Sequence, residues 1–260
     1  MSGRVLAVTN QKGGVGKTTT VANLGAALAD AGARVLLVDL DPQCSLTLSF
    51  GLRPSEVARS SCELLAEPEA EPHGAVVAVD GEGGALDLVP ASRRLGDLEP
   101  RLAQATAKEL YLREALAPVV GEYEIVLVDT PPNLGVLTIN ALTAAHGVLV
   151  PLQPEFLPLQ GLGDLDATIA LLRRYRVNPE LAIVGVIATM ATRRLVLERE
   201  VLEAAAALEV PLLRTRIPRS VRFAEAPAHG RPLVRWLPEH PGAAAYRRLA
   251  EEVQDVRLAA

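Results

Sequence analysis

Short apolar runs alternate with longer amphipathic stretches along most of the chain. Seven runs rich in β-branched residues predict strands at Val5–Thr9, Val35–Asp39, Leu86–Pro90, Ile125–Asp129, Val148–Pro151, Ile183–Thr189 and Pro211–Ile217. The stretches between them predict helices at about 18–31, 106–118, 135–146, 160–176, 195–208 and 242–257. Most of the runs are almost continuously apolar, as in strands that are covered on both faces. The pattern predicts an α/β fold with a mostly parallel twisted sheet and helices on both faces.

One stretch, residues 67–84, breaks this alternation. It is rich in proline, glycine and acidic residues, which predicts a surface excursion with a hairpin at Asp80-Gly81. The chain shows no internal repeat and no long linker. We therefore expect a single domain over residues 1–260.

The composition is that of a globular protein with a large core. Of the 260 residues, 49% are hydrophobic, yet no apolar run reaches the roughly 18 to 20 residues of a membrane span. No secretory signal opens the chain, so we expect a cytoplasmic protein with no membrane partner. Cys44 and Cys62 are too few for a disulfide framework and have no metal-binding spacing.

The net charge of −5 is unevenly distributed. Residues 1–172 hold 11 basic and 21 acidic side chains, a balance of −10, and residues 173–260 hold 15 basic and 10 acidic, a balance of +5. All the basic residues of the second part are arginines. This distribution permits an anionic partner on one face of an acidic protein, although a solvated arginine-rich surface would look the same.

A glycine cluster follows the first predicted strand and precedes the first predicted helix. Glycines allow successive backbone N–H groups to turn toward phosphate oxygens, and the helix start adds its positive dipole end. The lysine that follows can reach the β- and γ-phosphates, and the next hydroxyl can bind Mg²⁺. The predicted nucleotide-binding residues are Lys12, Gly13, Gly14, Val15, Gly16, Lys17, Thr18 and Thr19.

Three carboxylates follow predicted strands. Asp39 and Asp41 point the same way at the end of one strand, because side chains alternate along a strand. Asp129 ends another strand in the stretch "IVLVDTPP". At the edge of the sheet beside the glycine cluster, these acids can serve the water shell of a metal ion and an attacking water.

The glycine cluster also departs from the standard phosphate-binding pattern G-x-x-x-x-G-K-[ST]. Gln11 stands at the position of the first glycine, and Lys12 follows it. "KGGVGKT" resembles the deviant P-loop of the ParA/MinD family of ATPases, and the resemblance extends from Val5 to about Val253. It implies ATP or ADP with Mg²⁺ as cofactors, catalytic roles for Lys12, Lys17 and Asp41, and an ATP-dependent homodimer in which Lys12 reaches the partner's nucleotide. It also implies that Thr18, Asp39 and Asp129 form the metal region, with "DTPPNLGVLTINAL" as the switch that senses the γ-phosphate.

The later stretch "IPRSVRFAEAPAHGRPL" resembles the ParA/Soj branch, the partition ATPases that segregate chromosomes or plasmids. The resemblance implies nonspecific double-stranded DNA and a ParB-type protein as partners, with a nucleoid-associated location. It places Pro218 and Ser220 at the adenine, although the family commonly has asparagine at the position of Ser220. Cys44 likewise stands where glycine is usual. The candidate DNA-binding residues are Arg193, Arg194, Arg219 and Arg222.

Alternative interpretations remain. The same arginines could form a solvated rim or pair with Glu198, Glu200 and Glu225. A MinD-like or cargo-positioning ATPase could act at a membrane or on another partner, although the C-terminal helix lacks the broad apolar stripe of a membrane-surface helix. A third possibility is an ATPase subunit that powers a metabolic or transport reaction.

Overall fold

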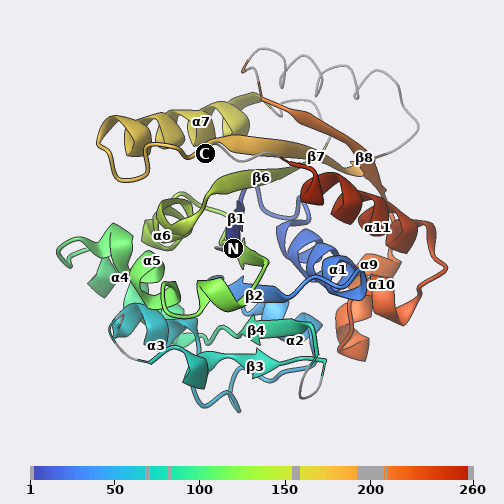
Figure 1. Ribbon diagram of the computed structural model, residues 1–260, viewed down its shortest axis with the longest axis horizontal. Helices are drawn as coiled ribbons and strands as arrows, with labels where there is room; N and C mark the ends of the chain where they lie inside the picture. The colour runs from blue at the N-terminus through green and yellow to red at the C-terminus, as the bar shows by residue number, and fades with distance from the viewer. Residues whose placement is uncertain are drawn as a thin grey trace.

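The structure is a computed structural model that describes residues 3–67, 69, 71–80, 84–153, 159–191, 208 and 210–256. Its strands form one eight-stranded sheet in the order β3-β4-β2-β5-β1-β6-β7-β8, parallel except for β3 (Figure 1). The strands are β1 (Arg4–Val8), β2 (Val35–Asp39), β3 (Val77–Ala78), β4 (Leu86–Val89), β5 (Ile125–Asp129), β6 (Gly147–Leu152), β7 (Ile183–Ala191) and β8 (Leu212–Pro218). The predicted α/β class with a mostly parallel sheet is confirmed.

Helices connect most of the strands. The α-helices are α1 (Lys17–Asp30), α2 (Ser45–Ser49), α3 (Ser61–Ala66), α4 (Arg94–Leu102), α5 (Tyr111–Leu116), α6 (Val136–Ala144), α7 (Leu159–Arg174), α9 (Arg222–Glu225), α10 (Leu233–Trp236) and α11 (Pro241–Gln254). Four short 3-10 turns are η1 (His73–Ala75), η2 (Lys108–Leu110), η3 (Val120–Glu122) and η4 (Ala226–His229).

The alternation of side chains along each strand builds a hydrophobic core on each face of the sheet. In β1, Val5 belongs to one core cluster and Leu6 to the other. The first cluster packs against α3 to α7, and the second packs against α1 and α11. Figure 1 shows these two groups of helices on opposite sides of the sheet. Because both faces are covered, the strands are apolar throughout, as the sequence predicted.

The strand order brings the ends of three strands together. In register, Val8 of β1 pairs with Asp129 of β5, and Asp39 of β2 pairs with the same Asp129. The next strand along the chain after β5 is β6, which lies on the far side of β1. The order therefore reverses around β1, and ligands of such sheets bind beyond the carboxyl ends of the strands at this reversal.

Some short elements differ from the prediction. The helix expected at 106–118 is observed as η2 followed directly by α5, and it starts only after Ala107, whose left-handed φ of 51° does not fit a right-handed helix. The helices α2, α3, α4, α9 and α10 and the strand β3 were not predicted. The helix expected at 195–208 lies outside the described residues except for its last position.

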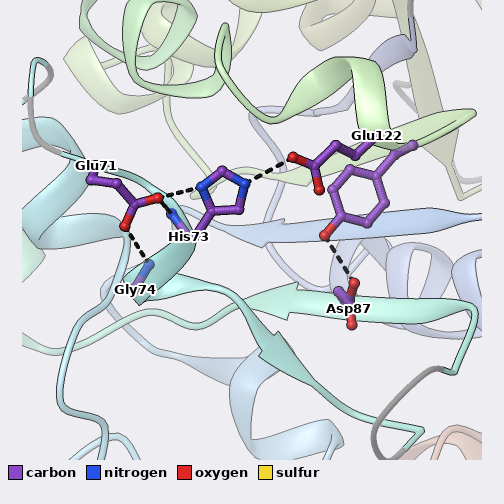
Figure 2. A network of polar contacts seen from close by, with 6 residues as sticks. Glu71, His73, Gly74, Asp87 and Glu122 are labelled. Atoms are coloured by element: carbon purple, nitrogen blue, oxygen red, sulfur yellow. Dashed lines mark hydrogen bonds and ion pairs between the residues drawn. The ribbon is translucent and has the colours of Figure 1, made fainter.

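The excursion that contains η1 contacts η3, the turn before β5, through a polar network (Figure 2). The imidazole of His73 contacts the carboxylates of Glu71 and Glu122, with 2.8 Å between Nε2 and Glu122 Oε1. These carboxylates raise the pKa of His73, with Glu122 the larger influence. Next to Glu122, the Tyr123 hydroxyl donates to Asp87 Oδ2 on β4 at 2.8 Å. Of the hairpin expected at Asp80-Gly81, Gly81 lies outside the described residues.

Candidate functional site

The loop between β1 and α1 is shaped by two glycines and anchored by one asparagine. Gly14 and Gly16 have φ values of 74° and 89°, which glycine adopts without the strain imposed by a Cβ. Asn10 accepts the backbone N–H of Lys12 at 3.0 Å and donates its own amide to the Pro151 carbonyl at 2.8 Å. The loop therefore has the tight turn that the glycine cluster predicted, and it is attached to β6.

Lys17 opens α1 and lies almost completely inside the protein, with 7% of its surface exposed. Its Nζ donates to the Lys12 carbonyl at 3.2 Å. Burial lowers the pKa of Lys17, whereas the negative charges of Asp129 and Asp41 raise it. The ammonium group is thus held at the helix start next to two carboxylates, where it can meet a phosphate.

Asp129 is the most unusual acid of the site. Its carboxylate is fully buried, and neither oxygen has a hydrogen-bond partner among the described residues. Burial raises the pKa of Asp129 well above its usual range, and Asp39 adds to the rise; the nearby Thr18 hydroxyl opposes it without forming a hydrogen bond of ordinary geometry. A buried carboxylate without a donor is costly unless a cation balances it. The pair of Asp129 and Thr18 therefore fits a magnesium ion, whose other ligands would be phosphate and water oxygens.

Asp39 has a different environment. Its Oδ2 accepts the backbone N–H and the hydroxyl of Thr47 at 2.9 and 2.7 Å, and its Oδ1 accepts the N–H of Asp41 at 3.1 Å. Burial nevertheless raises the pKa of Asp39 to about 6. The described contacts make Asp39 the residue that fixes the start of α2 and the position of Asp41. Its predicted place in the metal region stays a prediction.

Asp41 lines a cavity of about 420 Å³ above the glycine loop. Its Oδ1 accepts the N–H of Gln43 at 2.9 Å. The lining comes from the glycine loop, the start of α1, the loop before α2, α2 itself, the loop after β5, the end of β7, α9 and η4. These residues are Gly13, Gly14, Gly16, Lys17, Thr18, Thr19, Asp41, Gln43, Ser45, Leu48, Ser49, Pro132, Met190, Phe223, Ala224 and Pro227. The side chain of Val15 is buried beneath the loop, and Lys12 is exposed at its surface. The structure thus brings the predicted Lys17, Thr18 and Asp41 to one cavity.

A second cavity of about 300 Å³ adjoins the first and is mostly apolar. Its lining is Gly16, Thr19, Thr189, Met190, Ile217, Pro218, Arg219, Ser220, Val221, Phe223, Ala224 and Tyr246. Pro218 and Ser220, the predicted base-contacting residues, both belong to it. The Ser220 hydroxyl accepts the Arg222 N–H at 3.2 Å and lies 3.3 Å from His240 Nε2.

Sequence reasoning missed Met190 and Phe223, which line both cavities. Met190 directly follows the strand predicted at 183–189, at the edge of the sheet where the glycine loop also lies. That position was an available signal for a site residue. Phe223 has no comparable signal, because an isolated aromatic residue after a strand is usually part of a core.

The candidate DNA-binding arginines are only partly described. Arg193 and Arg194 lie outside the described residues. Arg219 is exposed and has no ion-pair partner among the residues that the structure describes. Arg222 is exposed but pairs with Glu225 Oε2 at 2.6 Å, which agrees for this residue with the alternative of an internal ion pair. Arg219 is therefore the more available cation of the two.

The described part of the chain contains no helix that is both long enough and apolar enough to cross a bilayer.

The sequence of the chain is similar to those of known ATPases. A family described as an AAA domain matches residues 3–183. The chromosome-partitioning ATPase Soj of Thermus thermophilus is 45% identical over 252 residues, covering 96% of this chain and 95% of that protein. The sporulation initiation inhibitor protein Soj of Bacillus subtilis is 41% identical, covering 96% and 98%. The chromosome partitioning protein ParA of Caulobacter vibrioides is 43% identical, covering 96% and 93%.

Solved structures show the same fold. A structure named cobyrinic acid a,c-diamide synthase from Mycobacterium smegmatis, with bound ADP and magnesium, is 41% identical with a TM-score of 0.82, covering 97% of this chain and 94% of that one. The cell division ATPase MinD of Pyrococcus furiosus is 28% identical with a TM-score of 0.76, covering 97% and 98%.

Proposed function

Because this chain belongs to the ParA/Soj family of partition ATPases, we propose that it is an ATP-dependent switch that binds nonspecific DNA as a dimer and releases it after hydrolysis. The chain is an ATPase, and its cofactors are ATP or ADP with magnesium. The switch itself, the dimer and a ParB-type partner that stimulates hydrolysis are the proposed part.

The observation that carries the nucleotide chemistry is the buried, unpartnered carboxylate of Asp129 beside Lys17 and Thr18. Magnesium, when bound, neutralises phosphate charge. In the proposed site, Thr18 and Asp129 hold this ion, and Lys17 contacts the phosphates from the start of α1. The backbone N–H groups of Gly13 to Gly16 complete the phosphate contacts.

Asp41 is the residue proposed to orient the attacking water. It lines the phosphate cavity, and Asp39 fixes its backbone through the hydrogen bond from Asp41 N. Phosphoryl transfer depends mainly on position and charge stabilisation, so a carboxylate that orients the water can contribute to hydrolysis beside Lys17 and magnesium. Pro218 and Ser220 are proposed to contact the base in the adjoining apolar cavity.

Lys12 is proposed to act in the partner subunit. Its side chain is exposed, whereas Lys17 is buried beside its own phosphate cavity. An exposed lysine at the edge of this cavity can reach the nucleotide of a second copy that faces it. This role accounts for two lysines around one glycine cluster.

Arg219 is proposed as the main described contact to DNA phosphate, with Arg222, Arg193 and Arg194 as further candidates. To test this, Arg219→Glu is compared with Arg101→Glu, an exposed arginine on α4, at ATP concentrations that saturate each variant. We expect Arg219→Glu to weaken DNA binding by at least roughly tenfold and to lower the salt slope by about 2 per dimer. Unchanged DNA affinity in Arg219→Glu would remove Arg219 from the interface.

A second candidate function follows from the synthase name of the Mycobacterium smegmatis structure. An ATPase that drives a metabolic reaction should hydrolyse ATP rapidly without DNA or a partner protein. Basal turnover separates the two functions: slow hydrolysis that rises with DNA and a ParB-type protein supports the partition switch, and fast hydrolysis in their absence supports the enzyme.

A further inference from the structure

Met190 has a backbone conformation that side-chain-bearing residues rarely adopt. Its φ is 51°, in the left-handed region that favours glycine. The cause is a bulge near the end of β7. Ala188 pairs with Arg216 and Ala191 pairs with Pro218, so β7 advances by three residues where β8 advances by two. Bulges with left-handed residues are common beside functional sites, where they redirect a side chain.

The bulge directs Met190 to the boundary between the two cavities. The cavities share the lining residues Gly16, Thr19, Met190, Phe223 and Ala224. One cavity contains the phosphate-binding groups Lys17 and Thr18, and the other is largely apolar. A nucleotide that fills both must place its sugar at this shared boundary.

The residue before Met190 has a separate task. The Thr189 hydroxyl donates to the Val15 carbonyl at 2.8 Å and so joins the end of β7 to the glycine loop. This hydrogen bond fixes the backbone on the phosphate side. It does not require any side chain at position 190, where glycine would give the same φ without strain.

We propose that Met190 is a nucleotide-positioning residue whose side chain, together with Phe223, packs against the sugar of bound ATP. The thioether side chain is unbranched and flexible, so it can adapt to a ligand that enters and leaves. The half-buried position of Met190 fits this role, because a residue retained only for the core would be covered in the free protein. The proposal rests on the ATPase assignment and is independent of DNA binding.

The test compares two ligands by calorimetry in the presence of magnesium. ATP fills both cavities, whereas tripolyphosphate fills only the phosphate cavity. For Met190→Gly we expect ATP and ADP affinity to fall roughly tenfold, with tripolyphosphate affinity unchanged and no loss of thermal stability. Met190→Leu should retain most of the ATP affinity, because it keeps an apolar side chain of similar size.

Thr189→Val is the matched control. This variant removes the hydrogen bond to the glycine loop, so its affinities for ATP and for tripolyphosphate should fall by similar factors. Unchanged ATP affinity in Met190→Gly, or equal losses for both ligands, would overturn the proposal, and Met190→Ala gives the same comparison if the glycine variant does not fold. Failure of the unmodified protein to bind ATP would instead contradict the proposed ATPase function.

Discussion

Among single residues, the site depends on charged side chains that are buried and on backbone conformations that are strained. Asp129 is buried without a hydrogen-bond donor among the described residues, and Lys17 is buried near it. Cys44 has a left-handed φ of 57° in the loop after Asp41. Glycine adopts a left-handed φ without strain, so this conformation suits the glycine that is usual at position 44. In this chain the side chain of Cys44 is buried in the core.

The buried charge of Asp129 gives a prediction for stability and pH. A carboxyl whose pKa is raised on folding stabilises the protein below its unfolded pKa, and this contribution is lost as pH rises through the folded pKa. Asp129→Asn removes the charge at nearly constant shape. We expect the nucleotide-free variant to be more stable than the unmodified protein at pH 8 by about 1 kcal/mol, or about 2–4 °C in Tm, with a smaller difference at pH 5.

The Asp129→Asn variant should also lose the proposed magnesium-binding role of the carboxylate. Magnesium should no longer strengthen ATP binding or support hydrolysis in Asp129→Asn. Thermal melts at both pH values, with and without Mg-ATP, check both statements. A variant that is destabilised at pH 8, or that keeps full magnesium dependence, would show that Asp129 is a structural residue.

At the scale of elements, two glycines close one wall of the nucleotide cavity. Gly51 follows α2 and Gly230 follows η4, and both have positive φ values, of 75° and 62°. A Cβ on Gly51 would lie 3.3 Å from the Cα of Gly230, so the two backbones touch. Leu48 of α2 and Pro227 of η4 line the phosphate cavity. The glycine contact therefore sets the distance between two segments of the wall.

Gly51→Ala should disturb this wall. A left-handed alanine costs about 1 kcal/mol, and the contact with Gly230 adds to that cost. Gly32→Ala is the control, because Gly32 has a φ of 97° and a Cβ there would meet nothing within 4 Å. We expect Gly51→Ala to be the less stable variant in denaturant unfolding and to bind ATP several-fold more weakly, with unchanged ATP affinity in Gly32→Ala. If the two substitutions changed stability and ATP affinity equally, the contact between Gly51 and Gly230 would have no special role in shaping the cavity.

Most long elements could be predicted from the sequence, and the short ones could not. The strands β1, β2 and β5 are almost continuously apolar, so their positions follow from the local sequence alone. The helix α2 has five residues, and its start is fixed by the contacts of Thr47 with Asp39, which are tertiary interactions. The bulge at Met190 depends on the pairing of β7 with β8, and no local sequence signal encodes it.

The site was predicted where a motif is continuous and less well where it is assembled from distant segments. The glycine loop, Lys17, Thr18, Asp41 and Asp129 could be proposed from the sequence because each ends or follows a strand or starts a helix, and their roles stay predictions. The hydrogen bonds to the two oxygens of Asp39 come from Thr47 in a later helix and from Asp41, two positions further along the chain, and the strand-end pattern does not reveal them.

For the whole molecule, the proposed switch requires two copies of the chain around two nucleotides. Lys12→Ala should leave ATP binding in the monomer but weaken ATP-dependent dimerisation by roughly 100-fold, because an ion pair across the interface is lost. Light scattering after size exclusion, with Asp41→Ala as the background to prevent turnover, measures this. Lys108→Ala, at the third lysine, should dimerise normally. A dimer of unchanged affinity in Lys12→Ala would assign Lys12 to its own subunit.

Control of DNA binding by ATP can be measured in a gel-shift titration of the Asp41→Ala protein on nonspecific duplex DNA. The titration compares ATP, ADP and no nucleotide at low and moderate salt. We expect binding with ATP alone, and we expect this binding to weaken steeply as salt rises, because phosphates are the contacts. Absence of binding with every nucleotide, or equal binding with all of them, would contradict the switch. Flotation with anionic liposomes would then test a membrane role for the same ATPase fold.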